Sequence, residues 1–369
     1  MRPLAIRFHF CILSLIAMLL TMHPAQAQRP FRLAIAGLVH GHVDGMLRLA
    51  GARSDVEIVG IYEPKAELAK RYAERYSLPQ QILYTDLKTM LEAVKPDAVS
   101  TFTNTFDHAM VVEACATHNT PVMMEKPLAV SMAHATRIQA AAKLHKIAVI
   151  VNYETSWYPS HAAIWQLTRQ NAALGAIRKV VAMDGHQGPK EIGVGADFLS
   201  FLTDPKLNGA GALFDFGCYG ANLMTWLMDN QRPIAVYAIT QQFKPQIYPH
   251  VDDEATIIVE YAHAQGIIQA SWNWPVGRKD LEVYGAKGYA IATGGSTLRV
   301  RLPDRLEEAI APSEVPATSR DGLAYLVAVV RSEIKPSGLS SLENNMIVTE
   351  ILEAAKKSAQ TGKRVILHP

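Results

Sequence analysis

The alternation of short apolar runs with helical stretches in the first half of the chain constrains its fold most. The runs are rich in β-branched residues, as buried parallel strands are, and cover Phe31–Ala36, Val56–Tyr62, Ala98–Thr101, Pro121–Met124 and Ala148–Asn152. Helical spacing separates them over Pro64–Tyr76, Leu87–Val94, His108–His118 and Ser131–His145. Pro64 suits a first helical turn. Such βαβ alternation predicts a doubly wound parallel sheet with right-handed crossovers.

The rhythm changes after Asn152. Strand-like runs then follow one another with turn signals between them, which is typical of an antiparallel sheet. These runs are Ile177–His186, Ile234–Gln242, Glu254–Tyr261, Gly266–Trp272 and Leu281–Tyr284, and the closing helices are expected over Asp321–Ile334 and Leu342–Gln360. A chain of 369 residues can hold two domains, each with its own core. We therefore predict an α/β fold: a signal peptide over 1–27, a Rossmann domain over 28–152 and an α+β domain with a mainly antiparallel sheet over 153–369.

The first 27 residues have the layout of a secretory signal peptide. Arg2 and Arg7 precede an apolar run from Phe10 to Leu20, and small residues stand at Ala25 and Ala27. The run is too short to span a bilayer, which takes roughly 20 residues. We expect cleavage after Ala27 and a periplasmic or secreted protein without a stable membrane anchor. A disordered or membrane-anchoring tail is the alternative.

Composition excludes several classes of function. Hydrophobic residues make up 49% and charged residues 19%, as in a soluble globular enzyme. Without residues 1–27 the acidic and basic side chains are equal in number, so the basic surface that nucleic acid requires is not expected. The remaining Cys115 and Cys218 are too few for a disulfide framework and are expected to be packed thiols. We expect neither a metal site nor nucleotide-triphosphate chemistry, because no Cys/His spacing or Gly-Lys phosphate loop is present.

The turn after the first strand is the first candidate for cofactor binding. A dinucleotide fold needs a tight turn there and a helix N-terminus whose free N–H groups meet a pyrophosphate. Gly37 matches the first glycine of G-x-G-x-x-G, whereas Val39 and His42 occupy the other two glycine positions and Gly41 comes one residue early. His40 and His42 either join the cofactor site or only close the turn.

Glu63 ends the second strand, 26 residues after Gly37. A carboxylate at this place can bind the adenosine ribose hydroxyls and repels a 2′-phosphate. The expected cofactor is therefore NAD, with NADP less favoured. A solvated carboxylate at a strand end is the alternative.

The segment Glu125–Pro127, directly after the fifth strand, reads Glu-Lys-Pro. It resembles the motif of the Gfo/Idh/MocA family, which includes glucose–fructose oxidoreductase and inositol dehydrogenase. Thr103, Asn104 and His108 stand where that family carries Thr-Pro-Asn and His after its fourth strand. The resemblance implies that Lys126 reaches the nicotinamide ribose and the substrate hydroxyl. A surface lysine before a turn proline is the alternative.

The turn and the family motif together give the predicted cofactor-binding residues. These are Gly37, Val39, His40, Gly41, His42, Glu63, Thr103, Asn104, His108, Glu125 and Lys126.

A second motif lies in the second domain. Many family members carry Asp-x-Gly-x-His there, and the segment Asp215–Asn222, with Tyr219 at the His position, resembles the glucose–fructose oxidoreductase branch. Asp215 and Tyr219 are four residues apart and would share one face of a helical turn. A phenol with a pKa near 10 becomes a useful base only beside a cation, which Lys126 can supply. We predict Lys126, Asp215 and Tyr219 as catalytic, with Tyr219 as the base. The reverse assignment of Lys126 and Tyr219 stays open, and a plain core role for Tyr219 is the alternative.

Further polar and aromatic residues stand at strand ends of the second domain, each with a structural role as the alternative. Together they favour a polyhydroxylated ligand, which needs hydrogen-bonding groups over apolar platforms. The predicted substrate-binding residues are Tyr153, His186, Lys190, Asn222 and Trp274.

The resemblance extends from Phe31 to Leu367 and implies an NAD(P)-dependent oxidoreductase acting on CH–OH groups. Its expected reaction moves hydride between a sugar or polyol carbon and nicotinamide. An NAD-dependent glycosidase that works by transient oxidation and a non-catalytic sugar-binding protein are the alternatives, because a fold alone does not fix function. We expect a small-molecule sugar or polyol partner, no nucleic acid, and a homo-oligomer.

Overall fold

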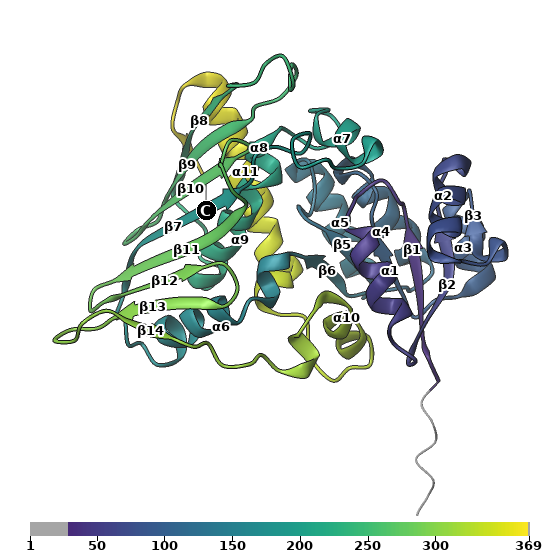
Figure 1. The fold of residues 1–369 in the computed structure, drawn as a ribbon, viewed down its shortest axis with the longest axis horizontal. Coiled ribbons are helices and arrows are strands. Elements are labelled where there is room, and N and C mark those ends of the chain that lie inside the picture. The colour runs from purple at the N-terminus through teal and green to yellow at the C-terminus, as the bar shows by residue number, and fades with distance from the viewer. Residues whose placement is uncertain (1–28, 368–369) are drawn as a thin grey trace, which may run out of the picture.

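The computed structural model describes residues 29–367. The predicted signal peptide, residues 1–27, lies outside the described residues. Within them two sheets are arranged side by side, each with its own helices (Figure 1). No helix of this part is both long and apolar enough to cross a membrane.

The first sheet confirms the predicted doubly wound Rossmann fold. Its described strands all run parallel in the order β3-β2-β1-β4-β5-β6. They are β1 Phe31–Ala36, β2 Val56–Tyr62, β3 Leu83–Tyr84, β4 Ala98–Thr101, β5 Val122–Glu125 and β6 Val149–Asn152. Because β1 lies between β2 and β4, the strand order reverses there, which is where such sheets bind ligands at their carboxyl ends.

Helices cover both faces of this sheet, and three of them begin as the sequence suggests. They are α1 Val43–Gly51, α2 Ala66–Tyr76, α3 Leu87–Val94, α4 His108–Thr117 and α5 Met132–His145. Asp86 caps α3 and Ser131 caps α5 by accepting a backbone N–H from the first turn. Pro64 was expected in the first turn of α2, but the helix begins at Ala66, because Lys65 is its N-cap and has an extended backbone.

The second sheet is mainly antiparallel, as predicted, with one parallel pair between β7 and β10. Its order is β14-β13-β12-β11-β7-β10-β9-β8-β15. The strands are β7 Ile177–Gly185, β8 Ala235–Gln241, β9 Glu254–Glu260, β10 Gln265–Ser271, β11 Arg278–Gly285, β12 Tyr289–Thr293, β13 Thr297–Arg301, β14 Glu308–Ile310 and β15 Val365–Ile366. The strands β12 to β15 were not predicted from the sequence.

Two long helices separate the sheets. Figure 1 shows α9 (Gly217–Leu227) and α11 (Leu342–Thr361) between them, and α11 contacts both β8 and α5. The other helices are α6 Pro159–Trp165, α7 Ala196–Leu202, α8 Ala212–Asp215 and α10 Gly322–Val330. Short turns are η1 Gln80–Ile82, η2 Thr105–Asp107, η3 Glu154–Trp157, η4 Gln166–Gln170, η5 Ala317–Ser319 and η6 Gly338–Ser340.

The helix α10 returns to the first domain although it lies late in the sequence. Its Leu323 and Leu326 are fully buried in the same apolar cluster as Val43 and Leu47 of α1. Asp321 begins the helix by accepting the N–H of Ala324 at 2.7 Å. The first domain is therefore completed by a segment from within residues 153–369.

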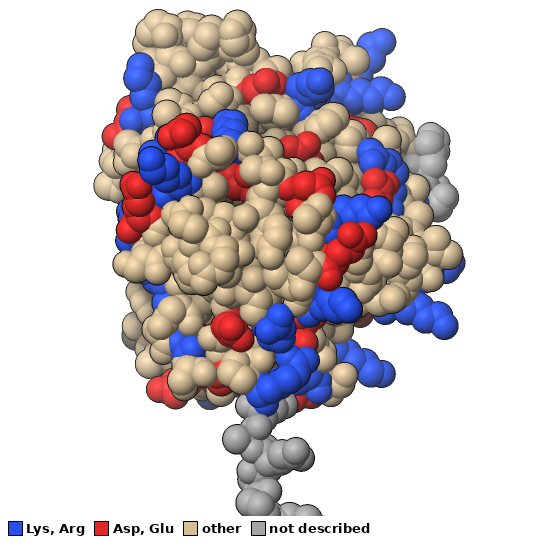
Figure 2. Space-filling view, turned by 90° about the vertical axis from the view of Figure 1, so that its right-hand side faces the viewer, with Lys and Arg blue, Asp and Glu red and all other residues tan. Residues whose placement is uncertain are grey.

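Charges of both signs are present on the outer face of the first domain. Figure 2 shows acidic and basic side chains next to each other around a broad area without charged side chains. Cys115 and Cys218 are both buried free thiols, which confirms the prediction from their number and setting.

Candidate active site

A buried ion pair joins the two domains. Lys126 directly follows β5, and Asp215 is the last residue of the short helix α8. The Lys126 ammonium donates to Asp215 Oδ1 at 2.5 Å and to the Asp215 carbonyl oxygen at 2.9 Å. Trp272, which follows β10, donates its indole N–H to Asp215 Oδ2 at 2.9 Å. Each charged side chain is only 5% exposed, so the pair lies away from bulk water.

Both members of the pair are ionised at neutral pH. Burial acts to raise the pKa of Asp215, but the charge of Lys126 and its hydrogen bond outweigh burial and hold the pKa below its ordinary value. Burial acts to lower the pKa of Lys126, yet the attraction of Asp215 leaves that pKa raised. Each charge thus maintains the other, as expected for a buried pair at close distance.

Tyr219 lies in the first turn of α9 and completes the predicted catalytic group. Its ring centroid is 5.0 Å from the Lys126 ammonium and 5.4 Å from that of Lys279. Burial, followed by the charge of Glu154 and other nearby acids, raises the pKa of Tyr219 well above its ordinary value. This is opposite to the expected lowering, because the ammonium of Lys126 lies over the ring and is already paired with Asp215.

Lys279 was missed by sequence reasoning. It is the second residue of β11 and donates to Glu154 of η3 at 2.7 Å. The strand register places it opposite Asp184 of β7, which is fully buried. Burial raises the pKa of Asp184 well above its ordinary value, so Glu154 is the ionised partner of Lys279. Only the pairing of β11 with β7 brings this lysine to the site, and local sequence carries no signal of it.

A cavity of about 660 Å³ lies beside these groups. Glu154, Tyr158, His186, Trp274 and Lys279 are among the residues that line it. It therefore offers aromatic faces and charged groups next to Tyr219, in a volume suited to a small ligand. Two of the predicted substrate-binding residues, His186 and Trp274, belong to this wall.

The other three predicted substrate-binding residues have different places. Tyr153 is fully buried and packs edge-on against Tyr219, with ring centroids 5.4 Å apart. Lys190 is exposed and does not line the cavity. Asn222 is fully buried and donates its amide to the carbonyl oxygen of Leu339 at 2.8 Å. The structure thus brings Tyr153 next to the site as support for Tyr219, and does not bring Lys190 or Asn222 to it.

The predicted adenosine end of the cofactor site forms a small pocket of about 210 Å³. It is lined by residues that include Gly37, Val39, Glu63, Thr103 and Asn104. Gly37 has φ +84°, and a Cβ there would come within 2.6 Å of the Thr103 side chain, so only glycine fits.

Glu63 is held firmly at the end of β2. Its carboxylate accepts the backbone N–H groups of Leu38 and Lys65 at 2.8 and 3.0 Å. Burial raises its pKa, and these two hydrogen bonds oppose the rise. A carboxylate fixed in a pocket beside the glycine turn is the acceptor to which the hydroxyls of an adenosine ribose donate, so these residues fit the adenosine half of a dinucleotide.

A third cavity, of about 480 Å³, adjoins the far side of the turn, and its lining includes Gly41, His42, Glu125 and Asn152. His42 Nδ1 lies 2.9 Å from Glu125 Oε2, and Asn152 donates to Glu125 Oε1 at 2.8 Å. His108 is buried with a pKa lowered to about 4, and its ring N–H donates to the carbonyl oxygen of Pro127 at 3.1 Å. His108 therefore supports the loop that carries Lys126.

His40, His42 and Glu125 form a group that spacing along the sequence did not reveal. One ligand atom from each lies within 4.8 Å of the others. His40 Nδ1 accepts the backbone N–H of His42 at 3.2 Å, and His42 contacts Glu125, so each histidine already has a protein partner. The absence of a metal stays a prediction.

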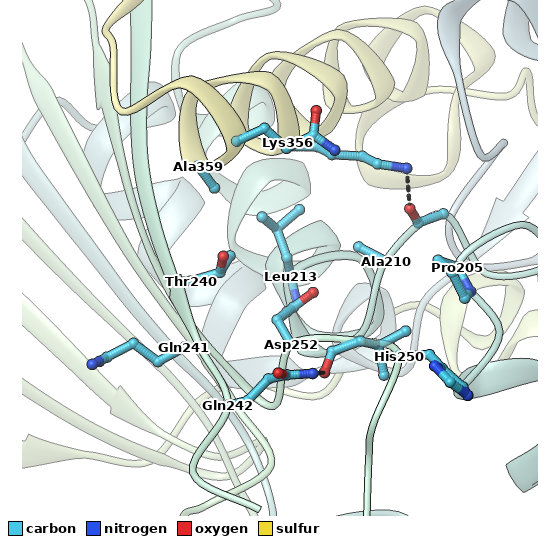
Figure 3. A pocket seen from close by; sticks show the side chains of 13 residues that line it. Pro205, Ala210, Leu213, Thr240, Gln241, Gln242, His250, Asp252, Lys356 and Ala359 are labelled. Carbon is cyan, nitrogen blue, oxygen red and sulfur yellow. Dashed lines mark hydrogen bonds between the residues drawn. The ribbon is translucent and has the colours of Figure 1, made fainter. Parts of the chain in front are cut away.

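One further cavity, of about 350 Å³, lies by α8 and α11 (Figure 3). Thr240, His250, Asp252 and Lys356 line it, and the Lys356 ammonium donates to the carbonyl oxygen of Gly209. None of the predicted site residues contributes to its wall.

The comparison with protein families agrees with this architecture. Residues 31–153 match the oxidoreductase family with an NAD-binding Rossmann fold, and residues 165–291 match the Gfo/Idh/MocA C-terminal domain. The two matches cover more than half of the chain. The chain therefore belongs to the Gfo/Idh/MocA family of oxidoreductases, as its motifs predicted. Its class is that of a CH–OH oxidoreductase with an NAD-binding Rossmann domain.

Relatives extend over nearly the whole chain. The bovine trans-1,2-dihydrobenzene-1,2-diol dehydrogenase is 24% identical over 88% of this chain and 94% of its own length. The D-glucoside 3-dehydrogenase of Escherichia coli K12 is 22% identical over 94% of this chain and 100% of its own. Among solved structures, the aldose–aldose oxidoreductase of Caulobacter crescentus superimposes with a TM-score of 0.78 at 20% identity, covering 92% of this chain and 100% of that one. At this identity the structural likeness shows the fold.

Proposed function

We propose that this protein transfers hydride between a hydroxyl-bearing carbon of a sugar or polyol and NAD. The observation that carries the proposal is the buried Lys126–Asp215 pair beside Tyr219. It lies at the end of the Rossmann strand β5. Lys279, whose ammonium is 5.4 Å from the centroid of the Tyr219 ring, lines a cavity of the second domain. A site at a domain junction with titratable groups of perturbed pKa is the usual place for such chemistry.

The chain's own groups handle the proton of the reaction. Oxidising an alcohol requires a base within about 3 Å of its oxygen while hydride leaves the carbon. A bound nicotinamide supplies the hydride acceptor. Lys126 donates a hydrogen bond to the substrate oxygen and stabilises negative charge on it, and Asp215 fixes the ammonium. Tyr219 is our choice for the group that accepts the proton. Because burial raises its pKa, only its small ionised fraction can act as the base at neutral pH.

Glu63 with Gly37, Thr103 and Asn104 would hold the adenosine, while His42, Glu125 and Asn152 lie toward the nicotinamide end. The preference for NAD rests on Glu63. A 2′-phosphate within about 4 Å of its carboxylate would be repelled by ~4 kcal/mol at an effective dielectric constant near 20.

The substrate class is supported by the cavity and by the relatives. Trp274 and Tyr158 offer aromatic faces, and the ion pair of Lys279 with Glu154 offers hydrogen-bonding groups. The named activities of the relatives include those of a D-glucoside 3-dehydrogenase and a D-apiose dehydrogenase. We therefore expect a polyhydroxylated substrate.

An NAD-dependent glycosidase is the second candidate. The Lys279–Glu154 pair favours it, because a transient-oxidation mechanism needs a further proton-transfer group at a carbon next to the oxidised one. Mass spectrometry of the native protein for retained NAD, followed by a panel of polyols and glycosides, tests both candidates. Net NADH formation with a free sugar supports the dehydrogenase, and release of an aglycone without net NADH supports the glycosidase.

We also propose that the protein is exported after cleavage between Ala27 and Gln28, on the strength of the apolar run and the small residues before it. N-terminal sequencing of protein from the culture medium or periplasm should begin at Gln28. An intact Met1 on soluble cytoplasmic protein would contradict the proposal.

A further inference from the structure

The helix α7 belongs to the second domain but covers the dinucleotide turn of the first. The ring of Phe198 lies against Gly41, where a Cβ would approach it to 2.9 Å. The same ring packs against His40, with ring centroids 4.4 Å apart. Side chains of α7, including Phe201, also line the pocket that contains Glu63. The adenosine end of the predicted cofactor site is thus walled by both domains.

Asp197, in the first turn of α7, binds two cations of the first domain. Its carboxylate oxygens accept from the Lys65 ammonium and from the Arg71 guanidinium, each at 2.8 Å. The two cations are 58% and 62% exposed, whereas Asp197 is 27% exposed. Exposed ion pairs add little to the stability of a fold. The significance of this cluster therefore lies in its place beside the predicted cofactor pocket. Lys65 and Asp197 line the same pocket as Glu63.

These two cations are of the kind that recognises a 2′-phosphate. In Rossmann folds an arginine near the end of the second strand accommodates the 2′-phosphate of NADP, while an acid there binds the ribose hydroxyls of NAD. Lys65 comes two residues after Glu63, and Arg71 lies further along α2. Both form an ion pair with Asp197, which lies more than a hundred positions later in the sequence.

We propose that Asp197 is a selectivity residue for the cofactor, which favours NAD over NADP by neutralising Lys65 and Arg71. The proposal rests on the proposed binding of a nicotinamide dinucleotide. It assigns part of the selectivity to the second domain.

The other charged groups near α2 provide a matched control. Asp44 of α1 pairs with Arg75 of α2 at 3.2 Å and accepts a hydrogen bond from the hydroxyl of Tyr76. Asp44→Asn removes the same charge as Asp197→Asn from the same region. It leaves Lys65 and Arg71 paired, so it controls for a general change in the electrostatic potential.

Calorimetric titration of cofactor-free protein with NAD and with NADP tests the proposal without any activity measurement. In Asp197→Asn we expect the Kd for NADP, relative to that for NAD, to fall about tenfold, because charge-assisted hydrogen bonds to phosphate become available. Adding Lys65→Gln and Arg71→Gln to this variant should return the ratio to its original value. Asp44→Asn should leave the ratio unchanged, and Asp197→Ser should reproduce Asp197→Asn.

An unchanged ratio in both Asp197 variants, with NAD still bound, would overturn the role of Asp197 alone. Failure of the wild-type chain to bind either dinucleotide would overturn the role of Asp197 together with the proposed function. A gain in NADP affinity that survives loss of Lys65 and Arg71 would also contradict the proposal, since those cations are its physical cause.

Discussion

Removing Lys126 should destabilise the protein in a way that depends on pH. Lys126→Met leaves the Asp215 carboxylate buried, with the Trp272 indole as its remaining side-chain donor. Breaking a buried pair by removing one partner typically costs about 3–5 kcal/mol. Because Trp272 still donates a hydrogen bond, we expect a loss of about 3 kcal/mol in the free energy of unfolding at neutral pH.

The pH dependence follows from the pKa of Asp215. In the wild type this pKa is lowered in the folded state, so the pair contributes stability above the unfolded pKa and loses it as the pH falls through the folded pKa. In Lys126→Met the main group that opposes burial is gone, so the folded pKa of Asp215 rises and that variant loses stability as the pH increases. The difference between the two proteins should therefore shrink as the pH falls toward about 4, the ordinary pKa of an aspartate.

Denaturant unfolding at neutral and acid pH measures this difference. Lys126→Met combined with Asp215→Asn should recover part of the loss, because no unpaired charge remains. Lys279→Met serves as the control, since it also removes a lysine but from a side chain that is 21% exposed. A Lys126→Met protein as stable as the wild type at neutral pH, or one not rescued by Asp215→Asn, would refute the account of the buried pair.

Three further predictions concern activity and packing. Because the pKa of Tyr219 is raised, the rate of alcohol oxidation should increase with pH while that of the reverse reduction falls, and Tyr219→Phe should abolish this dependence in steady-state pH profiles. In calorimetric titration, Glu63→Gln should bind NAD more weakly than the wild type and show a smaller difference between its affinities for NAD and NADP. Tighter binding of NADP than of NAD by the wild type would contradict the role assigned to Glu63. Asn222→Ala should lower the melting temperature, because it removes the hydrogen bond to Leu339 and a lost buried hydrogen bond costs about 1–3 kcal/mol. The KM for the substrate should stay within about twofold, because Asn222 lies away from the cavity. A raised KM for the substrate with an unchanged melting temperature would show that Asn222 contributes to substrate binding.

The parallel sheet could be predicted because its strands are buried on both faces and appear as continuous apolar runs. The edge strands could not be predicted in this way. All three residues of β14 are exposed, and β15 has only two residues, so neither carries an apolar pattern. In α9 ten of eleven residues are buried, and a helix buried on all sides shows no amphipathic stripe.

Site residues that belong to a sequence motif could be predicted. Site residues that are brought into place by the pairing of distant strands could not. Lys126 and Asp215 meet as their motifs imply, 89 residues apart in sequence. Lys279 reaches Tyr219 only through the pairing of β11 with β7. The side chain of Asn222 donates to the carbonyl oxygen of Leu339 in η6, 117 residues later in the sequence, a contact that the motif around Tyr219 does not indicate. The direction of the pKa shift of Tyr219 depends on burial, which the sequence motif does not contain.

The central claim is that Lys126 and Tyr219 carry out the proton transfer of an NAD-dependent oxidation. Single-turnover reduction of bound NAD, followed by the absorbance of the reduced nicotinamide after mixing with a reactive sugar or polyol, tests it most directly. We predict that Tyr219→Phe and Lys126→Met each slow this step about 10²- to 10⁴-fold, while the affinity for NAD stays nearly unchanged. Wild-type rates in both variants would contradict the account.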